Sequence, residues 1–199
     1  MDAWMIAGLW ILWTLYWYVA ARDAKPVLRS EGPFARLLHT APYLAGFVLL
    51  AMPALGRGWL FRRVLPANDE IRHFAVALVL CGLGFAAWAR VHLAGNWSNL
   101  VVLRRDHEFI TSGPYRLVRH PIYSGILLAV IGTAIARGDV RGLVAVGLIG
   151  AVIADQIAAE ERLLAATFGP AYRAYRLAVP ALLPRFGTSE LGERPSKIG

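Results

Sequence analysis

Five long apolar runs dominate the sequence and leave few folds open to it. They cover 3–21, 37–56, 74–89, 121–136 and 142–154, in a chain of 199 residues of which 57% are hydrophobic. A helix needs roughly 20 mainly apolar residues to cross the hydrocarbon layer of a bilayer. An open β-sheet cannot leave its backbone groups unpaired in lipid. The sequence therefore predicts an all-α integral membrane protein with about five transmembrane helices.

The runs differ in how well they fit a single crossing. The first two are long enough to span alone, and the third extends if Arg90 snorkels, with its stem in lipid and its head at the interface. The last two are short and are joined by 137–141, which predicts a tight helical hairpin. Asp2 is the only charged residue before the first run, which therefore lacks the basic start of a signal peptide, so we expect a retained span. The tryptophans of this span are expected to anchor and pack it.

Lysines and arginines in the connections predict the orientation. If five helices cross, the first loop, the third loop and the tail share one side and hold fourteen of these residues, against six on the other side. Cytosolic loops are enriched in Lys and Arg, so the N-terminus is predicted outside and the C-terminus in the cytosol, in a plasma or bacterial inner membrane. The net charge of +8 then requires no nucleic acid, because topology and anionic lipid account for it.

A single membrane domain is expected. Residues 1–73 hold two accessory spans, 74–187 form the core that carries the chemistry, and the polar tail 188–199 is expected to fray. Cys81 is the only cysteine, which excludes an internal disulfide and a thiolate cluster, and no metal is expected.

The connection over about 91–120 ends in a basic helix start. Pro121 suits the first position of a helix, which places His120 at the cap. Arg116, Arg119 and His120 would then converge on a helix N-terminus, whose free N–H groups and dipole favour an anion. This predicts a carboxylate or phosphate site. The alternative is that these arginines only obey the positive-inside rule.

Glu160 and Glu161 follow the fifth apolar run. Glu160 lies 18 residues beyond Gly142, roughly 27 Å along a helix, which places the pair near the cytosolic edge of the hydrocarbon layer. Because a short hairpin joins the last two helices, the Glu pair and the basic helix start should share one membrane face. Opposite charges could meet there, or jointly bind a zwitterion.

A short helix is expected to restart after Gly169-Pro170 and to stop at Pro180. It carries aromatic and basic residues (Tyr172, Arg173, Tyr175 and Arg176). Such a helix either anchors on lipid headgroups or forms a lid over the site.

Together these residues resemble the isoprenylcysteine carboxyl methyltransferase family, with the related phospholipid N-methyltransferases behind it. The resemblance runs from about Asn96 to Phe186. It rests on an ordered set of segments: Ile110–Arg116, Arg119–Gly125, Glu160–Glu161, Phe168–Tyr172, Tyr175 and Val179–Pro180.

The resemblance implies a methyltransferase that binds S-adenosylmethionine in a pocket at the cytosolic face, formed by the C-terminal half. The acceptor would be a lipid-like molecule from the bilayer, foremost the carboxylate of an isoprenylcysteine-type substrate. By position, Arg119 or Arg176 would face that carboxylate, or a phosphate, and Arg119, Glu160 and Arg176 are the candidate catalytic residues. The cofactor pocket would be formed by Tyr115, His120, Pro121, Tyr123 and Gly125, with Glu160 or Glu161 meeting the amino or ribose groups.

Three other functions remain open: a phospholipid amine N-methyltransferase, an NADPH-dependent sterol-type reductase, and a non-enzymatic membrane scaffold or transporter subunit. A carboxylate is already nucleophilic, whereas an amine acceptor must first lose a proton to a base. The candidate bases are expected to be committed to the cofactor, which favours the carboxylate. Binding of S-adenosylmethionine, of NADPH or of neither separates the classes.

Overall fold

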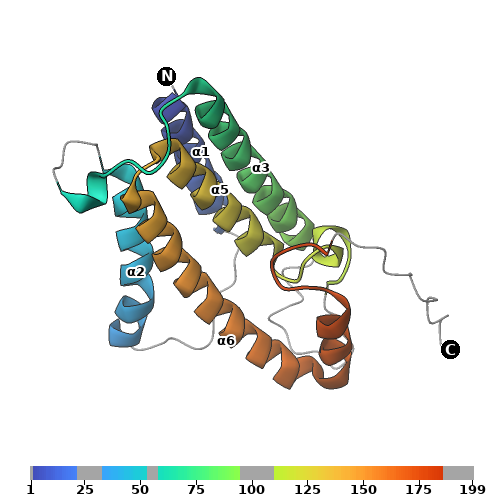
Figure 1. The fold of residues 1–199 in the computed structure, drawn as a ribbon. Coiled ribbons are helices and arrows are strands. Elements are labelled where there is room, and N and C mark those ends of the chain that lie inside the picture. The colour runs from blue at the N-terminus through green and yellow to red at the C-terminus, as the bar shows by residue number, and fades with distance from the viewer. Residues whose placement is uncertain (1, 22–32, 53–57, 95–109, 186–199) are drawn as a thin grey trace.

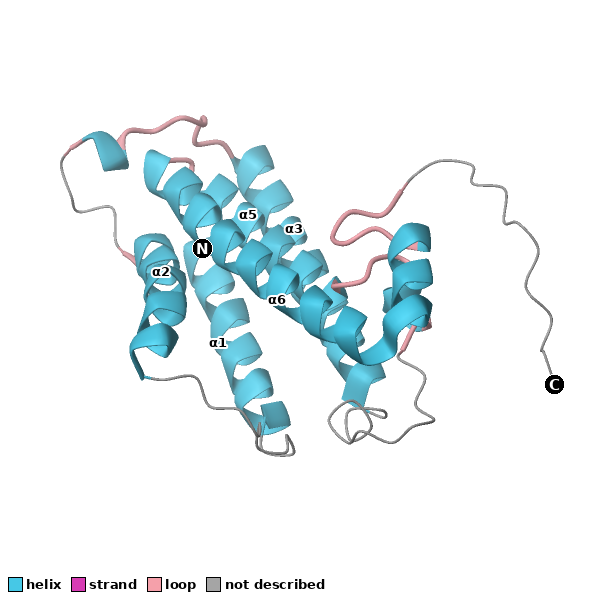
Figure 2. Cartoon of the chain, turned by 90° about the horizontal axis from the view of Figure 1, so that it is seen from below, coloured by secondary structure: helices cyan, strands magenta, loops and turns pink. Residues whose placement is uncertain are grey.

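The computed structural model describes residues 2–21, 33–52, 58–94 and 110–185. No strand occurs among them, as Figure 2 shows, so the all-α prediction is confirmed for this part of the chain. Within these described ranges, each of the five α-helices contains all or most of one apolar run. The elements are α1 (Asp2–Ala21), α2 (Pro33–Ala51), η1 (Trp59–Phe61), α3 (Asp69–Ala94), η2 (Gly113–Arg116), α5 (Pro121–Arg137) and α6 (Val140–Ala178).

Two of these helices are long and apolar enough to cross a membrane: α3 over Asp69–Leu93 and α6 over Val140–Ala178. The other three carry shorter apolar stretches, over Trp4–Ala20, Thr40–Ala51 and Pro121–Arg137. Five crossings therefore stay a prediction. The predicted tail over 188–199 and the start of the family resemblance at Asn96 lie outside the described residues.

The centre of the bundle is the antiparallel pair α3 and α5, which lie side by side (Figure 1). A methyl group added at Gly82 would come within 2.5 Å of the Gly125 carbonyl oxygen, and one at Gly125 within 2.4 Å of the Gly82 oxygen. Ala86 and Ala129, both fully buried, complete the contact. Lipid gives apolar helices no hydrophobic reason to associate, so close packing of small residues stabilises this pair.

The first two helices pack on different members of the core, α1 against α3 and α2 against α6. Trp10 of α1 donates from Nε1 to Thr133 Oγ1 of α5 at 3.0 Å. Its ring meets the edge of the Phe47 ring of α2, with centroids 5.1 Å apart. The packing role predicted for the aromatic residues of α1 is confirmed for this tryptophan.

The third helix extends past Arg90 as expected, but Arg90 is buried in the protein and does not snorkel. Arg90 is only 5% exposed, donates from NH2 to the Ala20 carbonyl at 2.8 Å, and lies over the Trp17 ring at 5.5 Å. The last carbonyl groups of a helix lack intrahelical donors and carry partial negative charge. The C-terminal end of α1 therefore solvates this cation inside the protein, and α3 continues past it to Ala94.

The predicted hairpin is confirmed. α5 ends at Arg137, α6 begins at Val140, and Gly138 takes a left-handed conformation (φ 63°) between them. Side chains of the turn satisfy the last carbonyl groups of α2: Arg137 donates to Leu50 and Met52, and Arg141 donates to Met52. The hairpin thus closes one end of the bundle and docks α2 onto it.

α6 extends far beyond its apolar run over 142–154. It has 39 residues, whereas its hairpin partner α5 has 17. Its second half leaves the bundle and bends, so that a short terminal segment turns back toward the start of α5 (Figure 1). This overhang forms the open end of the molecule.

We expect Gly82→Ala to lower the thermal unfolding temperature of the detergent-purified protein. The added methyl group would meet α5 backbone at 2.5–2.6 Å, and such overpacking costs about 1–3 kcal/mol. Gly84→Ala is the matched control on the same helix, because open space surrounds that position. It should be neutral, or gain up to about 1 kcal/mol of helix propensity. Equal unfolding temperatures for the two variants would argue against the α3–α5 contact.

Candidate functional site

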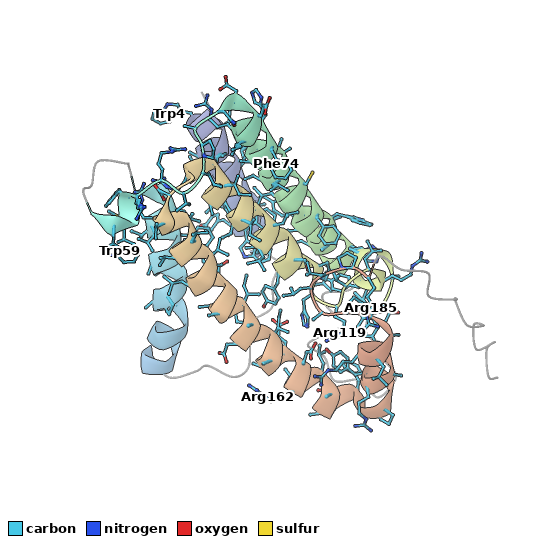
Figure 3. The ribbon with its side chains drawn as sticks, in the orientation of Figure 1. Trp4, Trp59, Phe74, Arg119, Arg162 and Arg185 are labelled. Carbon is cyan, nitrogen blue, oxygen red and sulfur yellow. The ribbon has the colours of Figure 1, made fainter. Side chains whose placement is uncertain are left out.

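Polar residues gather where the start of α5 meets the second half of α6, at the open end of the bundle. Figure 3 shows Arg119 lying between these two segments and the terminal part of α6. The hairpin joins α5 and α6 at the opposite end. From Val140 to Glu160, α6 rises roughly 30 Å, whereas α5 spans about 24 Å. The longer, tilted helix therefore carries its acidic residues to the level of the α5 start.

The start of α5 is built as the sequence predicts. Pro121 is its first residue, is buried, and follows His120 at the cap. The chain beyond α6 runs alongside: the N–H of Arg119 donates to the Pro180 carbonyl at 2.8 Å, and that of His120 donates to the Ala181 carbonyl at 3.0 Å. Backbone hydrogen bonds therefore hold the end of the described chain against this helix start.

Glu161 is the centre of a buried ion-pair network. Arg119 donates to Glu161 Oε1 from Nε at 2.9 Å and also from NH2. Its NH1 donates to the carbonyl groups of Arg176, at 3.0 Å, and of Val179. Arg176 Nε lies 3.2 Å from the other oxygen, Oε2. A carboxylate that is about nine-tenths buried requires such partners, and here both of its oxygens have them.

Glu160, the preceding residue, has a different environment. Its Oε1 accepts a hydrogen bond from the Tyr123 hydroxyl, and its Oε2 lies 3.5 Å from His120 Nδ1. The other ring nitrogen of His120, Nε2, lies 3.3 Å from Glu161 Oε1, so the imidazole bridges the two carboxylates. The Glu160 side chain is 48% exposed, against 10% for Glu161. One carboxylate is committed to the fold, and the other is accessible.

The bend in α6 lies at Gly169, whose φ of 54° and ψ of −122° suit only glycine. Pro170 then starts the terminal segment, which ends at Ala178 before Pro180. The predicted restart is confirmed. Because the chain reverses here, buried Tyr172 and the partly exposed Arg176 pack back toward Glu161.

The η2 turn is tied to this terminal segment. The Tyr175 hydroxyl donates to the Tyr115 carbonyl at 2.6 Å. Burial raises the pKa of the Tyr115 phenol well above its ordinary value, and nearby Tyr175 and Glu160 raise it further. Tyr115 is therefore a hydroxyl donor at physiological pH, not a base.

Sequence reasoning missed His92, in the last turn of α3. Its Nε2 lies 2.9 Å from Ser112 Oγ, and its ring stacks on Tyr115 with centroids 6.5 Å apart. Gly113 has a φ of 58°, and a methyl group there would come within 2.7 Å of the imidazole. The available signal was the glycine of this turn, because a positive φ against a ring excludes any side chain.

The structure brings six of the predicted site residues into one cluster: Arg119, His120, Tyr123, Glu160, Glu161 and Arg176. Tyr115 joins it through the terminal segment, and Pro121 supports it as the first residue of α5. Gly125 instead lies in the α3–α5 contact, and Arg116 is exposed. Within the described ranges, no group of three or more His, Cys, Asp and Glu residues is placed to hold a metal ion.

Residues 71–171 match the phospholipid methyltransferase family. The matched stretch covers half of the chain. It holds α3, η2, α5 and α6 as far as the bend, and so contains His92, the α5 start and both glutamates.

Three curated proteins illustrate the similarity. Protein-S-isoprenylcysteine O-methyltransferase B of Arabidopsis thaliana is 27% identical over 153 residues, covering 75% of this chain and 72% of the relative. Protein-S-isoprenylcysteine O-methyltransferase of Schizosaccharomyces pombe is 30% identical over 113 residues, covering 55% and 48%. The cobalt-zinc-cadmium resistance protein CzcN of Cupriavidus metallidurans is 30% identical over 99 residues, covering 49% and 42%. The chain thus spans nearly three quarters of the first relative and under half of the other two.

We expect Arg119→Ala to destabilise the protein by about 3–5 kcal/mol, the usual loss when one partner of a buried ion pair is removed. The variant also leaves the carbonyl groups of Arg176 and Val179 without their donor. Arg162→Ala, on the exposed outer side of α6, is the matched control (Figure 3). Thermal unfolding in detergent measures both, and a parent-like Arg119→Ala would refute the central role of the network.

Proposed function

The chain belongs to the phospholipid methyltransferase family, and from that premise we propose an S-adenosylmethionine-dependent enzyme that methylates the carboxylate of an isoprenylcysteine-type lipid. The relatives from Arabidopsis thaliana and Schizosaccharomyces pombe, both named protein-S-isoprenylcysteine O-methyltransferase, support this acceptor. The observation that best supports a ligand site here is the pair of adjacent carboxylates in different environments. Both oxygens of Glu161 are paired with arginines, whereas the neighbouring Glu160 side chain is about half exposed.

The residues at the α5 start fit the methyl donor. Glu160 suits an ammonium group or ribose hydroxyls, because it is half exposed and is oriented by Tyr123 and His120. The unpaired N–H groups of the first turn of α5 suit a carboxylate. S-adenosylmethionine, when bound, would supply a methyl group carried on a sulfonium, and S-adenosylhomocysteine would be the leaving group when an acceptor oxygen takes that methyl. The contribution of the protein is to hold and orient, since orientation lowers the barrier of such an in-line reaction.

Glu161 acts as a positioning residue in this proposal. It orients His120 through Nε2 and holds Arg119 and Arg176 at fixed distances. His120 in turn orients the Glu160 carboxylate through Nδ1. Of the two adjacent glutamates, Glu160 is therefore the one assigned to the methyl donor.

Arg176 is the better candidate for the acceptor carboxylate. Arg119 uses Nε, NH1 and NH2 on Glu161 and on two carbonyl groups, which leaves little of its guanidinium for a ligand. Arg176 is 58% exposed and meets Glu161 through Nε. Its outer edge can pair with a carboxylate in the bidentate geometry that guanidinium groups favour.

The site favours an oxygen acceptor over an amine. Tyr115 is held protonated, Glu161 is neutralised by two arginines, and Glu160 accepts from Tyr123. An amine acceptor would require one of these groups to take up its proton. A carboxylate requires none of them to do so, which supports ester formation over phospholipid N-methylation.

The orientation belongs to the same proposal. With five crossings, the N-terminus lies outside and the cluster faces the cytosol, because fourteen basic residues then fall on the cytosolic side against six on the other. Residues 1–73 serve as accessory spans, and 74–187 hold the site.

The test is calorimetric titration of the detergent-purified protein with S-adenosylhomocysteine, with NADPH in parallel. Saturable binding of the homocysteine compound alone is expected. Methyl transfer to an S-prenylcysteine acid should follow, with its methyl ester as the blocked control and phosphatidylethanolamine as the amine acceptor. Transfer to the amine but not to the acid would overturn the carboxylate assignment, and binding of NADPH alone would overturn the reaction class.

Substitution separates the two glutamates. Glu160→Gln should weaken S-adenosylhomocysteine binding about 10- to 100-fold, because a hydrogen bond to a charged group contributes about 1.5–3 kcal/mol. Its unfolding temperature should change little. Glu161→Gln should instead lower the unfolding temperature, since it removes a buried charge from two arginines. Glu70→Gln, in the first turn of α3, is the matched control for both. The reverse pattern would show that the roles are exchanged.

A further inference from the structure

Three exposed leucines, each close in sequence to an exposed arginine, mark the open end of the bundle. Leu163, Leu177 and Leu183 are 67%, 81% and 80% exposed. The pairs are Arg162 with Leu163, Arg173 with Leu177, and Leu183 with Arg185. We call these six residues the basic collar.

Contacts with the ion-pair cluster place the three pairs at one level. Leu163 follows Glu161 by two residues, and Leu177 follows Arg176, which pairs with Glu161. Leu183 follows Leu182, whose carbonyl accepts from Ser124 Oγ in the first turn of α5 at 2.7 Å. In Figure 3, Arg162 and Arg185 lie at the same end as Arg119, whereas Trp4 and Trp59 lie at the other end.

The collar has strong charge asymmetry. From Arg162 to Arg185 the chain holds four arginines and no acidic residue. Arg176 pairs with Glu161 of the cluster, and residues 162–185 contain no acidic side chain that could pair with the other three arginines. A surface of this kind complements an extended anion rather than a second cationic patch.

The leucines define what kind of anion fits. Fully burying a leucine side chain contributes about 1.5–3 kcal/mol, so three such side chains favour an apolar environment. Arg162 and Leu163 lie roughly 33–35 Å along α6 from Val140, which in a tilted helix corresponds to the edge of a ~30 Å hydrocarbon layer. There an arginine can keep its head among phosphates while a neighbouring leucine enters the acyl region.

We propose that the basic collar docks onto the anionic phospholipids of the leaflet that the site faces. Its leucines enter the acyl boundary and its arginines bind the phosphate groups. Docking adds a lipid contact to the segment beyond Gly169, which Tyr175 and Arg176 already tie to the site. This contact is separate from the chemistry of the reaction.

Insertion is tested by fluorescence depth measurement. In a Cys81→Ala background, which removes the only cysteine, Leu177→Cys and Leu183→Cys are labelled with bimane in nanodiscs. Lipids brominated on their acyl chains should quench both labels more than aqueous iodide does. Stronger quenching by iodide at both positions would place the collar in water and overturn the proposal.

Lipid selectivity is tested by electron paramagnetic resonance with spin-labelled phosphatidylglycerol and phosphatidylcholine. Arg173→Gln/Arg185→Gln should reduce the preference for phosphatidylglycerol about fivefold per arginine. Arg62→Gln/Arg63→Gln removes the same charge beside η1 at the other end of the bundle and should leave the preference unchanged. Equal losses for the two variants would show a general charge effect and overturn the assignment.

A third arm separates lipid from protein. A polyglutamate peptide is added to the detergent-solubilised protein. Binding that is lost in Arg173→Gln/Arg185→Gln, together with an unchanged lipid preference, would make the partner an acidic protein and not a bilayer. None of these readouts uses methyl transfer, so failure here is distinct from failure of the proposed function.

Discussion

The ion pair between Arg119 and Glu161 is the interaction on which the rest of the site depends. It joins the start of α5 to the far half of α6, and through the Arg176 and Val179 carbonyl groups it also holds the end of the terminal segment. A buried ion pair stabilises only when the remaining donors and acceptors are satisfied as well. Here two backbone carbonyl groups accept from Arg119, and Arg176 pairs with the second oxygen of Glu161, so that condition is met. The ion pair therefore depends on the bend of α6, which brings those groups back to it.

Two adjacent glutamates acquire opposite roles from this arrangement. Neighbouring residues on a helix point about 100° apart, so Glu161 faces the arginines while Glu160 faces Tyr123 and stays about half exposed. The imidazole of His120 lies between the two carboxylates and fixes their positions relative to each other. The result is one group that maintains the shape of the site and a second that is free to meet a ligand. The proposed reaction needs no general base, because its acceptor carboxylate is already nucleophilic.

The two ends of the bundle are built for different purposes. At the hairpin end, Arg137 and Arg141 close the chain onto the last carbonyl groups of α2. At the other end, the overhang of α6 and its bend at Gly169 leave polar groups accessible and apolar side chains exposed. The closely packed pair α3 and α5 connects the two ends. Gly125, which the family resemblance implied for the cofactor pocket, lies in that packed contact.

The sequence by itself determined the parts that local signals encode. Apolar runs predicted the five α-helices found among the described residues. Pro121 predicted the start of α5, the 137–141 turn predicted the hairpin, and Gly169-Pro170 predicted the reversal. Hairpin length also sufficed to put the glutamates level with the basic helix start. Each of these follows from residues close together in the chain, where backbone sterics and apolar length decide the outcome.

Only the tertiary structure decided which charges meet. Arg90 lies inside the protein because the C-terminal end of α1 and Trp17 reach it, and His92 supports η2 because a distant glycine leaves room for its ring. The choice between Glu160 and Glu161, and between Arg119 and Arg176, likewise depends on helices that are remote in sequence. A side chain's partner is set by the direction in which packed helices present it, and no local pattern specifies that direction.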